Sequence, residues 1–133
     1  MMPTKDSIAV TQSWQAAANA QDVDSLLALS DPDIEIVGPR GSGFGHQLLR
    51  EWLALAGLSL TTVRVCARDD VVVLAQHGVW RSLETGEIVG ERDLASRFRV
   101  ADRLVSQFAR YDSLDEALAA AGLQPSDEYV SEP

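Results

Sequence analysis

His77 is the residue whose type and surroundings best suit proton transfer. Histidine titrates near neutral pH, and the chain has only two, His46 and His77. The alternating run from Val71 to Ser82 is typical of a strand, and it places His77 among apolar side chains such as Val73 and Val79. A histidine in that setting could act as a general acid or base, or it could be a core histidine hydrogen-bonded to backbone.

A glycine-rich stretch precedes the other histidine. Residues 39–45 read Pro-Arg-Gly-Ser-Gly-Phe-Gly, and a helix is expected to begin at His46. Because the start of a helix is electropositive, Arg40 and His46 could meet a ligand carboxylate or phosphate at a pocket mouth. A solvent-exposed loop end is the alternative. The stretch lacks the Gly-Lys-Ser/Thr of a phosphate-binding loop and the spacing of a dinucleotide fingerprint.

Composition argues against several functions. Among 133 residues, eleven basic and twenty acidic side chains give a net charge of −9 at pH 7. This balance disfavours nucleic acid and anionic membranes, because their phosphates would be repelled. One cysteine, Cys66, and two distant histidines offer no metal-ligand spacing, so neither a metal nor a cofactor is expected. No Gly-x-Ser-x-Gly motif supports a hydrolase.

The length predicts one domain, since most domains have roughly 100–150 residues. Residues 1–122 are expected to form it, and 123–133 to form a polar tail, with a tail packed back on its own domain or on a partner as the alternative. No apolar run approaches the roughly 20 residues of a membrane span, and the first residues lack a signal-peptide core. A cytoplasmic location is therefore expected.

Periodicity divides the chain into helices followed by a strand meander. Helical spacing of apolar residues is found at 8–21, 23–29 and 46–56, and a capping box at Ser113 predicts a last helix to Ala121. Alternating segments predict strands at 33–38, 60–68, 71–82, 88–100 and 104–111. Helices segregated from a meander indicate an α+β fold, in which a curved antiparallel sheet forms a cone with N-terminal helices in its concave face. Such a hollow suits a small molecule.

The facing of residues in the long hairpin depends on its turn. If Thr85 and Gly86 form a two-residue loop, His77 faces Leu94, and a mostly apolar set faces the hollow. The expected pocket residues are Trp14, Val73, His77, Ser96, Phe98 and Tyr111. Trp14 also fits plain core, and the last turn does not decide whether Tyr111 points inward. A slip of one residue would exchange the two faces.

The opposite face of the same hairpin is more polar. It is expected to carry Gln76, Trp80, Asp93 and Arg97. We interpret this face as a homodimer interface, in which a two-fold axis pairs Asp93 with Arg97 across subunits and Trp80 supplies apolar area. A second polar site and a solvated sheet face are the alternatives.

The chain resembles the nuclear transport factor 2-like superfamily, which includes ketosteroid isomerases and polyketide cyclases. The resemblance spans about residues 5–122 and is carried by the order of elements and by four segments. These are residues 14–29, Asp33-Ile34-Glu35-Ile36, Gly45-His46, and Phe108-Ala109-Arg110-Tyr111-Asp112. It implies the cone, and it favours the homodimer because family members often pair their sheets.

The resemblance can be tested at the catalytic positions of the steroid isomerases. Those enzymes use an aspartate base with an oxyanion hole of a tyrosine and a protonated aspartic acid. The matching positions here hold Gly38, Trp14 and Ser96 respectively. Since Gly38 can accept no proton, isomerisation by that constellation is not expected.

These observations leave three functional hypotheses. The first is a protein that binds a small hydrophobic molecule in an apolar pocket. The second is an isomerase, cyclase or dehydratase that acts on a small hydrophobic substrate, with His77 as the proton-transfer group. The third is a non-catalytic dimeric scaffold or protein-binding module.

Overall fold

The computed structural model describes residues 3–38, 41–55 and 57–129, and of Leu55 it describes the backbone alone. The helices are α1 (Thr4–Asn19), α2 (Val23–Ala28), α3 (His46–Leu55) and α4 (Leu114–Ala121), and a short 3₁₀ turn, η1, spans Pro125–Asp127. The strands are β1 (Ser30–Gly38), β2 (Gly41–Phe44), β3 (Leu58–Arg68), β4 (Val71–Arg81), β5 (Ile88–Ala101) and β6 (Leu104–Tyr111). No helix of the described segments is long and apolar enough to cross a membrane.

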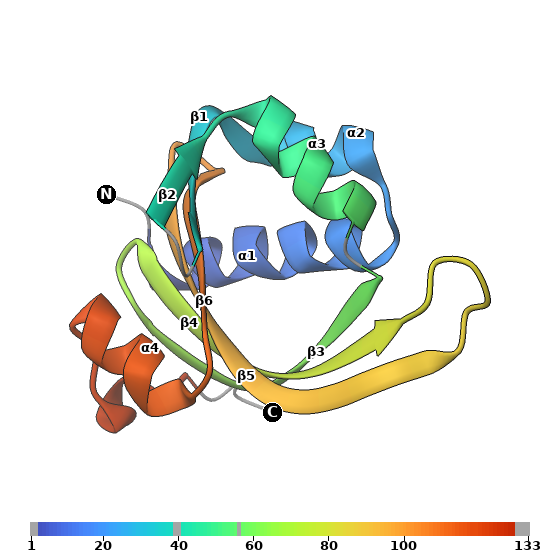
Figure 1. The fold of residues 1–133 in the computed structure, drawn as a ribbon. Coiled ribbons are helices and arrows are strands. Elements are labelled where there is room, and N and C mark those ends of the chain that lie inside the picture. Colours follow the sequence, from blue (N-terminus) through green and yellow to red (C-terminus); the bar gives the residue numbers. More distant parts are fainter. Residues whose placement is uncertain (1–2, 39–40, 56, 130–133) are drawn as a thin grey trace.

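The strands form one curled sheet in the order β2-β1-β6-β5-β4-β3. Neighbouring strands are antiparallel except β1 and β6, which run parallel. Helices α1, α2 and α3 lie on the concave side, and α4 packs on the convex side (Figure 1). The glycine-rich stretch was predicted as a loop, but its described part forms β2, because Gly41 to Phe44 pair with β1.

The ends of α2 and α4 follow local sequence signals. The Asp22 carboxylate accepts a hydrogen bond from the Ser25 amide at 3.2 Å, and the Ser113 hydroxyl accepts one from the Glu116 amide at 3.2 Å. Such caps satisfy amides that the first turn of a helix leaves free. Gly122 ends α4 at φ 70°, a left-handed angle that glycine adopts without strain.

The register of the long hairpin differs from the prediction by one residue. His77 pairs with Asp93 and Gln76 pairs with Leu94. The turn is longer than two residues, since the Ser82 amide donates to the Glu87 carbonyl, and a bulge follows at Trp80/Arg81. The extra residue, Val89, lies in β5, so beyond it the side chains of β5 change face relative to those of β4.

The concave side holds the main core. Trp14 is fully buried, with ring centroids 4.9 Å from Phe108, 5.3 Å from Phe98 and 5.9 Å from Trp52. Its indole N–H donates to the Ser30 hydroxyl at 2.9 Å. Trp14 and Phe98 therefore lie inside the cone, as predicted, but they fill it rather than line an open pocket.

The segment after α4 packs on the edge of the sheet as far as Tyr129. Leu123 is buried, Glu128 forms an ion pair with Arg64 at 2.8 Å, and the Tyr129 amide donates to the Val65 carbonyl at 2.7 Å. Residues 123–129 thus match the alternative in which the tail folds back on its own domain. Residues 130–133 lie outside the described part.

Candidate functional site at the open end of the cone

A chain of buried side-chain hydrogen bonds lies beyond the aromatic core. The Ser96 hydroxyl donates to Gln76 Oε1 at 2.7 Å, and Gln76 Nε2 donates to Gln15 Oε1. Gln15 Nε2 in turn donates to the Thr62 hydroxyl at 2.9 Å. Gln76 and Ser96 have no exposed surface, so this chain links β5, β4, α1 and β3 inside the cone. Ser96 therefore lies in the interior, as predicted, while Gln76 does not belong to the outer face.

Trp80 lies further toward the open end. It is half-buried on the concave side, and its six-membered ring covers Gly78, where an added Cβ would lie 3.2 Å from the Trp80 ring. Trp80 packs against the buried Leu58, Leu60 and Leu94. The predicted place of Trp80 on the outer face is wrong for the same reason as for Gln76, because the register change moves both inward.

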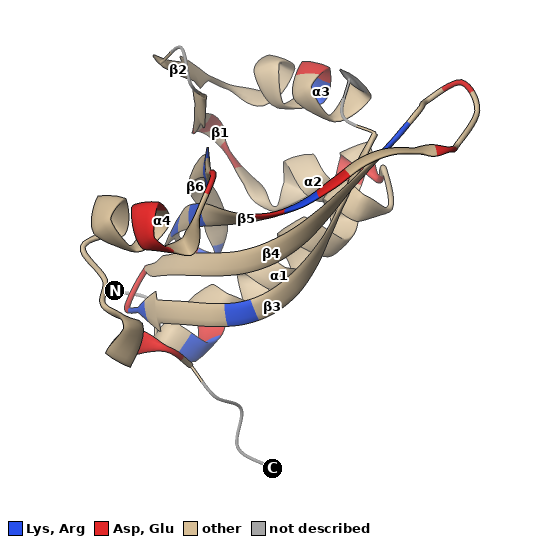
Figure 2. Ribbon diagram, turned by 60° about the horizontal axis from the view of Figure 1, so that its bottom comes forward, with Lys and Arg blue, Asp and Glu red and all other residues tan. Residues whose placement is uncertain are grey.

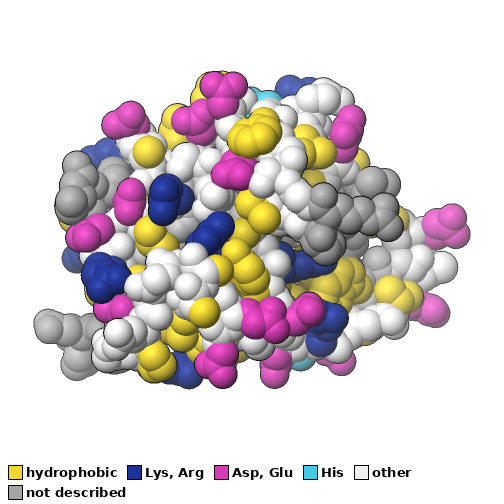
Figure 3. Space-filling view, turned by 60° about the vertical axis from the view of Figure 1, so that its left-hand side comes forward, with side chains coloured by type: hydrophobic (Ala, Val, Ile, Leu, Met, Phe, Trp, Pro, Cys, Tyr) yellow, Lys and Arg dark blue, Asp and Glu magenta, His cyan; other side chains and the backbone are white. Residues whose placement is uncertain are grey.

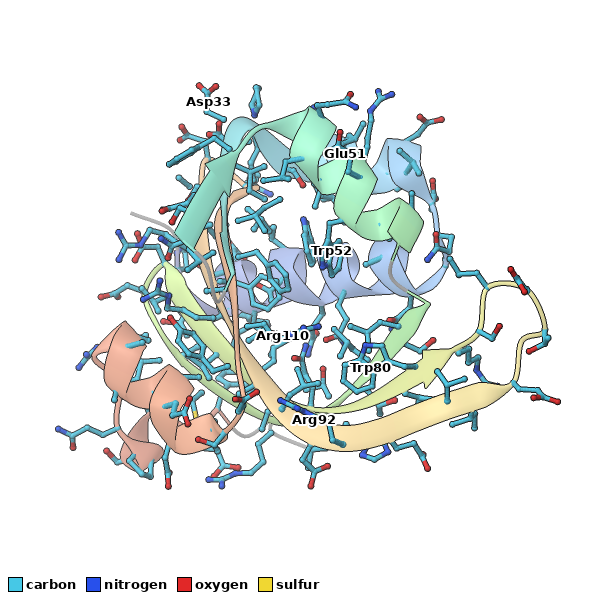
Figure 4. All side chains as sticks on the ribbon, in the orientation of Figure 1. Asp33, Glu51, Trp52, Trp80, Arg92 and Arg110 are labelled. Atoms are coloured by element: carbon cyan, nitrogen blue, oxygen red, sulfur yellow. The ribbon has the colours of Figure 1, made fainter. Side chains whose placement is uncertain are left out.

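Two arginines share the concave side with Trp80. Arg110 pairs with Ser96, which fixes its facing, and its guanidinium lies 5.9 Å from the centroid of the Trp80 ring. Arg92 pairs with Gly78 and forms an ion pair with Asp112. Figure 4 shows Trp52, Trp80 and Arg110, from three different elements, on the inner side of the curved sheet.

A surface hollow of about 250 Å³ adjoins Arg110. Its lining residues are Val37, Gly38, Arg110, Tyr111, Asp112 and Glu116. Gly38 contributes no side chain at the end of β1, which leaves room beside the guanidinium. On the face seen in Figure 3, apolar and basic side chains are interspersed, with acidic side chains around them.

His77 lies on the convex side and not in the hollow. Its side chain is 41% exposed, with Nδ1 3.0 Å from the Asp93 carboxylate and Nε2 3.3 Å from the Glu91 carboxylate. The prediction that His77 faces the hollow is wrong because of the register change. Residues 71–75 are apolar on both faces, since α1 covers one face of the sheet and α4 the other, so apolarity could not set the facing.

The two carboxylates raise the pKa of His77, Asp93 more than Glu91. Protonated His77 is therefore stabilised in the folded protein. Its contribution to stability is present at low pH and is lost as the pH rises through the raised pKa, above the ordinary value near 6.5. We expect an NMR titration of the His77 ring to give a pKa above that value, and we expect Asp93→Asn to lower this pKa while Glu91 keeps it above the ordinary value. An unchanged pKa in Asp93→Asn would contradict the pairing.

The convex side has its own hollow, of about 280 Å³, beside the start of α4. Its lining residues are Val63, Ala75, Gln76, Asp93, Leu94, Asp112, Ser113 and Leu114. Figure 2 shows charged residues of both signs along β5 and acidic residues at the tip of its hairpin. Asp93 faces this side, as predicted, with a 91% exposed side chain.

Three predicted site residues are covered by α4 on the convex side. Val73 is buried in the cluster beneath the helix, and Tyr111 packs against the same cluster, so neither faces the concave side. Arg97 faces outward, as predicted, but it donates to the Ala120 carbonyl at 2.9 Å and lies over the Tyr111 ring. Arg97 is therefore engaged within its own chain instead of awaiting Asp93 of a second one.

The remaining candidates do not form a site. His46 begins α3, and its Nε2–H donates to the Ser30 carbonyl at 3.0 Å, so it joins α3 to the start of β1. Arg110, by contrast, lies beside the far end of β1. Arg40 lies outside the described residues. Cys66 is buried, and burial raises the pKa of its thiol, which disfavours the reactive thiolate.

Sequence reasoning missed Arg110 as a site residue. The turn at Asp102 and Arg103 has two residues with positive φ, of 51° and 66°, and it joins the paired Ala101 and Leu104. That turn alone would set Arg110 opposite Ala95. A bulge at Arg99/Val100 moves Arg110 opposite Ser96 and onto the concave side.

Comparison with known proteins finds solved structures with a similar fold. No family model matches the sequence, and no curated protein matches it. A nuclear transport factor 2-like protein from Burkholderia xenovorans LB400 has a TM-score of 0.67 at 24% identity, over 91% of this chain and 98% of that chain.

Two further solved structures contain bound molecules. TerC, co-crystallised with polyporic acid, has a TM-score of 0.70 at 20% identity, over 87% of this chain and 97% of that chain. A Mycobacterium tuberculosis protein in complex with estradiol-17beta-hemisuccinate has a TM-score of 0.70 at 19% identity, over 85% and 97%. These likenesses confirm the predicted α+β cone.

Proposed function

We propose that this chain, which has the nuclear transport factor 2-like fold, binds a small and largely apolar molecule at the open end of its cone. The observation that carries the proposal is the contact of the Arg110 guanidinium with the half-buried Trp80 ring on the concave side, where Trp52 also lies (Figure 4). Binding sites commonly combine aromatic walls with a few placed polar groups. The Gln76 amide system supplies a fixed polar layer behind this wall.

Binding fits the concave side better than proton transfer does. The positions that the resemblance assigns to acid and base groups hold Trp14, Gly38 and Ser96, and Trp14 already donates its N–H to Ser30. His77, the proton-transfer group of the enzyme hypothesis, faces the opposite side of the sheet. The hypothesis of an isomerase, cyclase or dehydratase acting through His77 thereby loses its catalytic group.

The two ligand-bound neighbours support the proposal by analogy. One holds polyporic acid and the other estradiol-17beta-hemisuccinate. Both are small organic molecules, and both share with this chain a fold that hosts many unrelated functions. The analogy therefore supports a ligand of this general size without naming it.

A fluorescent probe tests the proposal. We expect N-phenyl-1-naphthylamine, which is uncharged and fluoresces in apolar surroundings, to bind the folded protein. Replacing Trp80 by alanine removes an aromatic wall and should weaken binding about tenfold, or about 1.4 kcal/mol. Phe44→Ala, which removes an aromatic ring that is 64% exposed on β2, is the matched control and should change nothing.

The NMR signals of the three tryptophan indole N–H groups show where the probe binds. Trp52 and Trp80 are half-buried on the concave side, so their signals should shift on titration, whereas the signal of the buried and hydrogen-bonded Trp14 should shift least. Absence of binding, or equal affinity of the Trp80→Ala and parent proteins, would contradict the proposal.

The homodimer stays a prediction that rests on the convex face. Of the four residues assigned to it, Gln76 and Trp80 face inward and Arg97 is held by α4, which leaves Asp93 together with its neighbours His77 and Glu91. The exposed Val63 and the 280 Å³ hollow supply apolar surface on the same side. Sedimentation of a monomer at micromolar concentration would remove the dimer.

A further inference from the structure

The two arginines of the concave side differ in their acidic partners. Arg92 is neutralised by its ion pair with Asp112. The Arg110 guanidinium makes neither an ion pair nor a hydrogen bond with any residue in the described ranges, and it lies over the Trp80 ring. Arg110 is an exposed cation on the concave side of the sheet, and without an acidic partner it is available for a ligand.

The contact with Trp80 leaves the N–H donors of Arg110 without an acceptor. The Arg110 Cζ lies over the Trp80 ring, 5.9 Å from its centroid, and the guanidinium N–H groups make no hydrogen bond with the described residues. Those donors match a carboxylate or sulfonate in a two-point arrangement. The hollow of about 250 Å³ that Arg110 and Gly38 help to line has room for such a group.

Two carboxylates line the same hollow, and either would occupy Arg110 if it formed an ion pair with the guanidinium. Asp112 is held by Arg92. Glu116, in the first turn of α4, makes no ion pair with Arg110. Since neither reaches the guanidinium, an incoming acid does not have to displace an existing partner.

We propose that Arg110 binds the acidic group of the ligand and that the ligand is an aromatic or similarly flat acid whose apolar body lies against Trp80. This inference rests on the proposed function, because it assigns a chemical class to the molecule held at the open end of the cone. It adds a requirement that apolar binding does not have, namely one negative charge placed beside β6.

Two probes with the same ring system separate the charge from the apolar body. 8-Anilino-1-naphthalenesulfonate is N-phenyl-1-naphthylamine with an added sulfonate. We expect the sulfonate to bind the folded protein at least about tenfold more tightly than the uncharged probe at low salt, since a hydrogen-bonded ion pair adds to the ring contact. Isothermal titration of both probes against the same protein gives the ratio.

Arg110→Gln keeps a polar side chain of similar reach and removes the charge. This variant should lower the affinity for the sulfonate probe about tenfold or more and change the affinity for the uncharged probe by less than about twofold. Arg99→Gln is the matched control, because Arg99 is an exposed arginine of β5 on the convex side. That variant should bind both probes as the parent protein does. Thermal unfolding of all three proteins shows that they remain folded.

The outcomes distinguish this inference from the proposed function. If neither probe binds, the proposed function fails and the inference falls with it. Two results would overturn only the inference while the uncharged probe still binds. One is that the sulfonate probe binds the parent protein no more tightly than the uncharged probe, and the other is that Arg110→Gln leaves the affinity for the sulfonate probe unchanged. If Arg99→Gln lowers the affinity for the sulfonate probe as much as Arg110→Gln does, the effect comes from net charge alone, and the inference is also overturned.

Discussion

Replacing Trp14 by alanine is expected to lower the free energy of unfolding by about 3–5 kcal/mol, the range for deleting a large buried aromatic side chain. Trp14 has no exposed surface, and three aromatic rings lie against it at centroid distances below 6 Å. Removing the indole leaves a cavity that these rings cannot fill without giving up their own contacts. The donor to the Ser30 hydroxyl is lost as well.

Two controls separate cavity formation from other effects. Trp14→Phe keeps a ring, loses the N–H, and should cost less than Trp14→Ala. Phe44→Ala removes an aromatic side chain that is 64% exposed and should change stability by no more than about 0.5 kcal/mol. Urea unfolding followed by far-ultraviolet circular dichroism measures all three without relying on tryptophan fluorescence. A loss below about 1 kcal/mol in Trp14→Ala would mean that the aromatic cluster is not the core.

Apart from β2, the types and order of the main elements were predictable because their signals are local. Asp22 and Ser113 cap the helices that follow them, and Gly122 ends α4, each through contacts within a few residues. The helices and the meander then restrict the architecture to a curved sheet with helices inside it. The confirmed fold therefore follows from short-range chemistry added along the chain.

The candidate site was not predictable to the same degree because bulges set which side chains share a face. One bulge at Trp80/Arg81 exchanged the facing of His77 and Gln76, and another at Arg99/Val100 turned Arg110 inward. Both sides of β4 are covered by helices, so the burial pattern that usually fixes register is ambiguous there. A single extra residue in a strand thus decides the chemistry of the open end.

Gln76 joins α1, β4 and β5 through side-chain hydrogen bonds inside the cone, and its loss should be costly. In Gln76→Leu the Gln15 carbonyl loses its donor and the Ser96 hydroxyl loses its acceptor, both inside the cone. Each buried orphaned group costs about 1–3 kcal/mol, so we expect a destabilisation of about 2–5 kcal/mol. Gln107→Leu is the matched control. Gln107 donates to Glu35 at 2.7 Å in a partly exposed position where water can replace it, and its loss should cost under about 1 kcal/mol.

A double-mutant cycle shows whether the chain of hydrogen bonds acts as a unit. Adding Ser96→Ala to Gln76→Leu removes one orphaned hydroxyl and should restore part of the lost stability, with a coupling of about 0.5–3 kcal/mol. Urea unfolding of the parent, both single variants and the double variant measures that coupling. If the two changes add to within about 0.5 kcal/mol, Ser96 and Gln76 are energetically independent, and the chain of hydrogen bonds does not act as a unit.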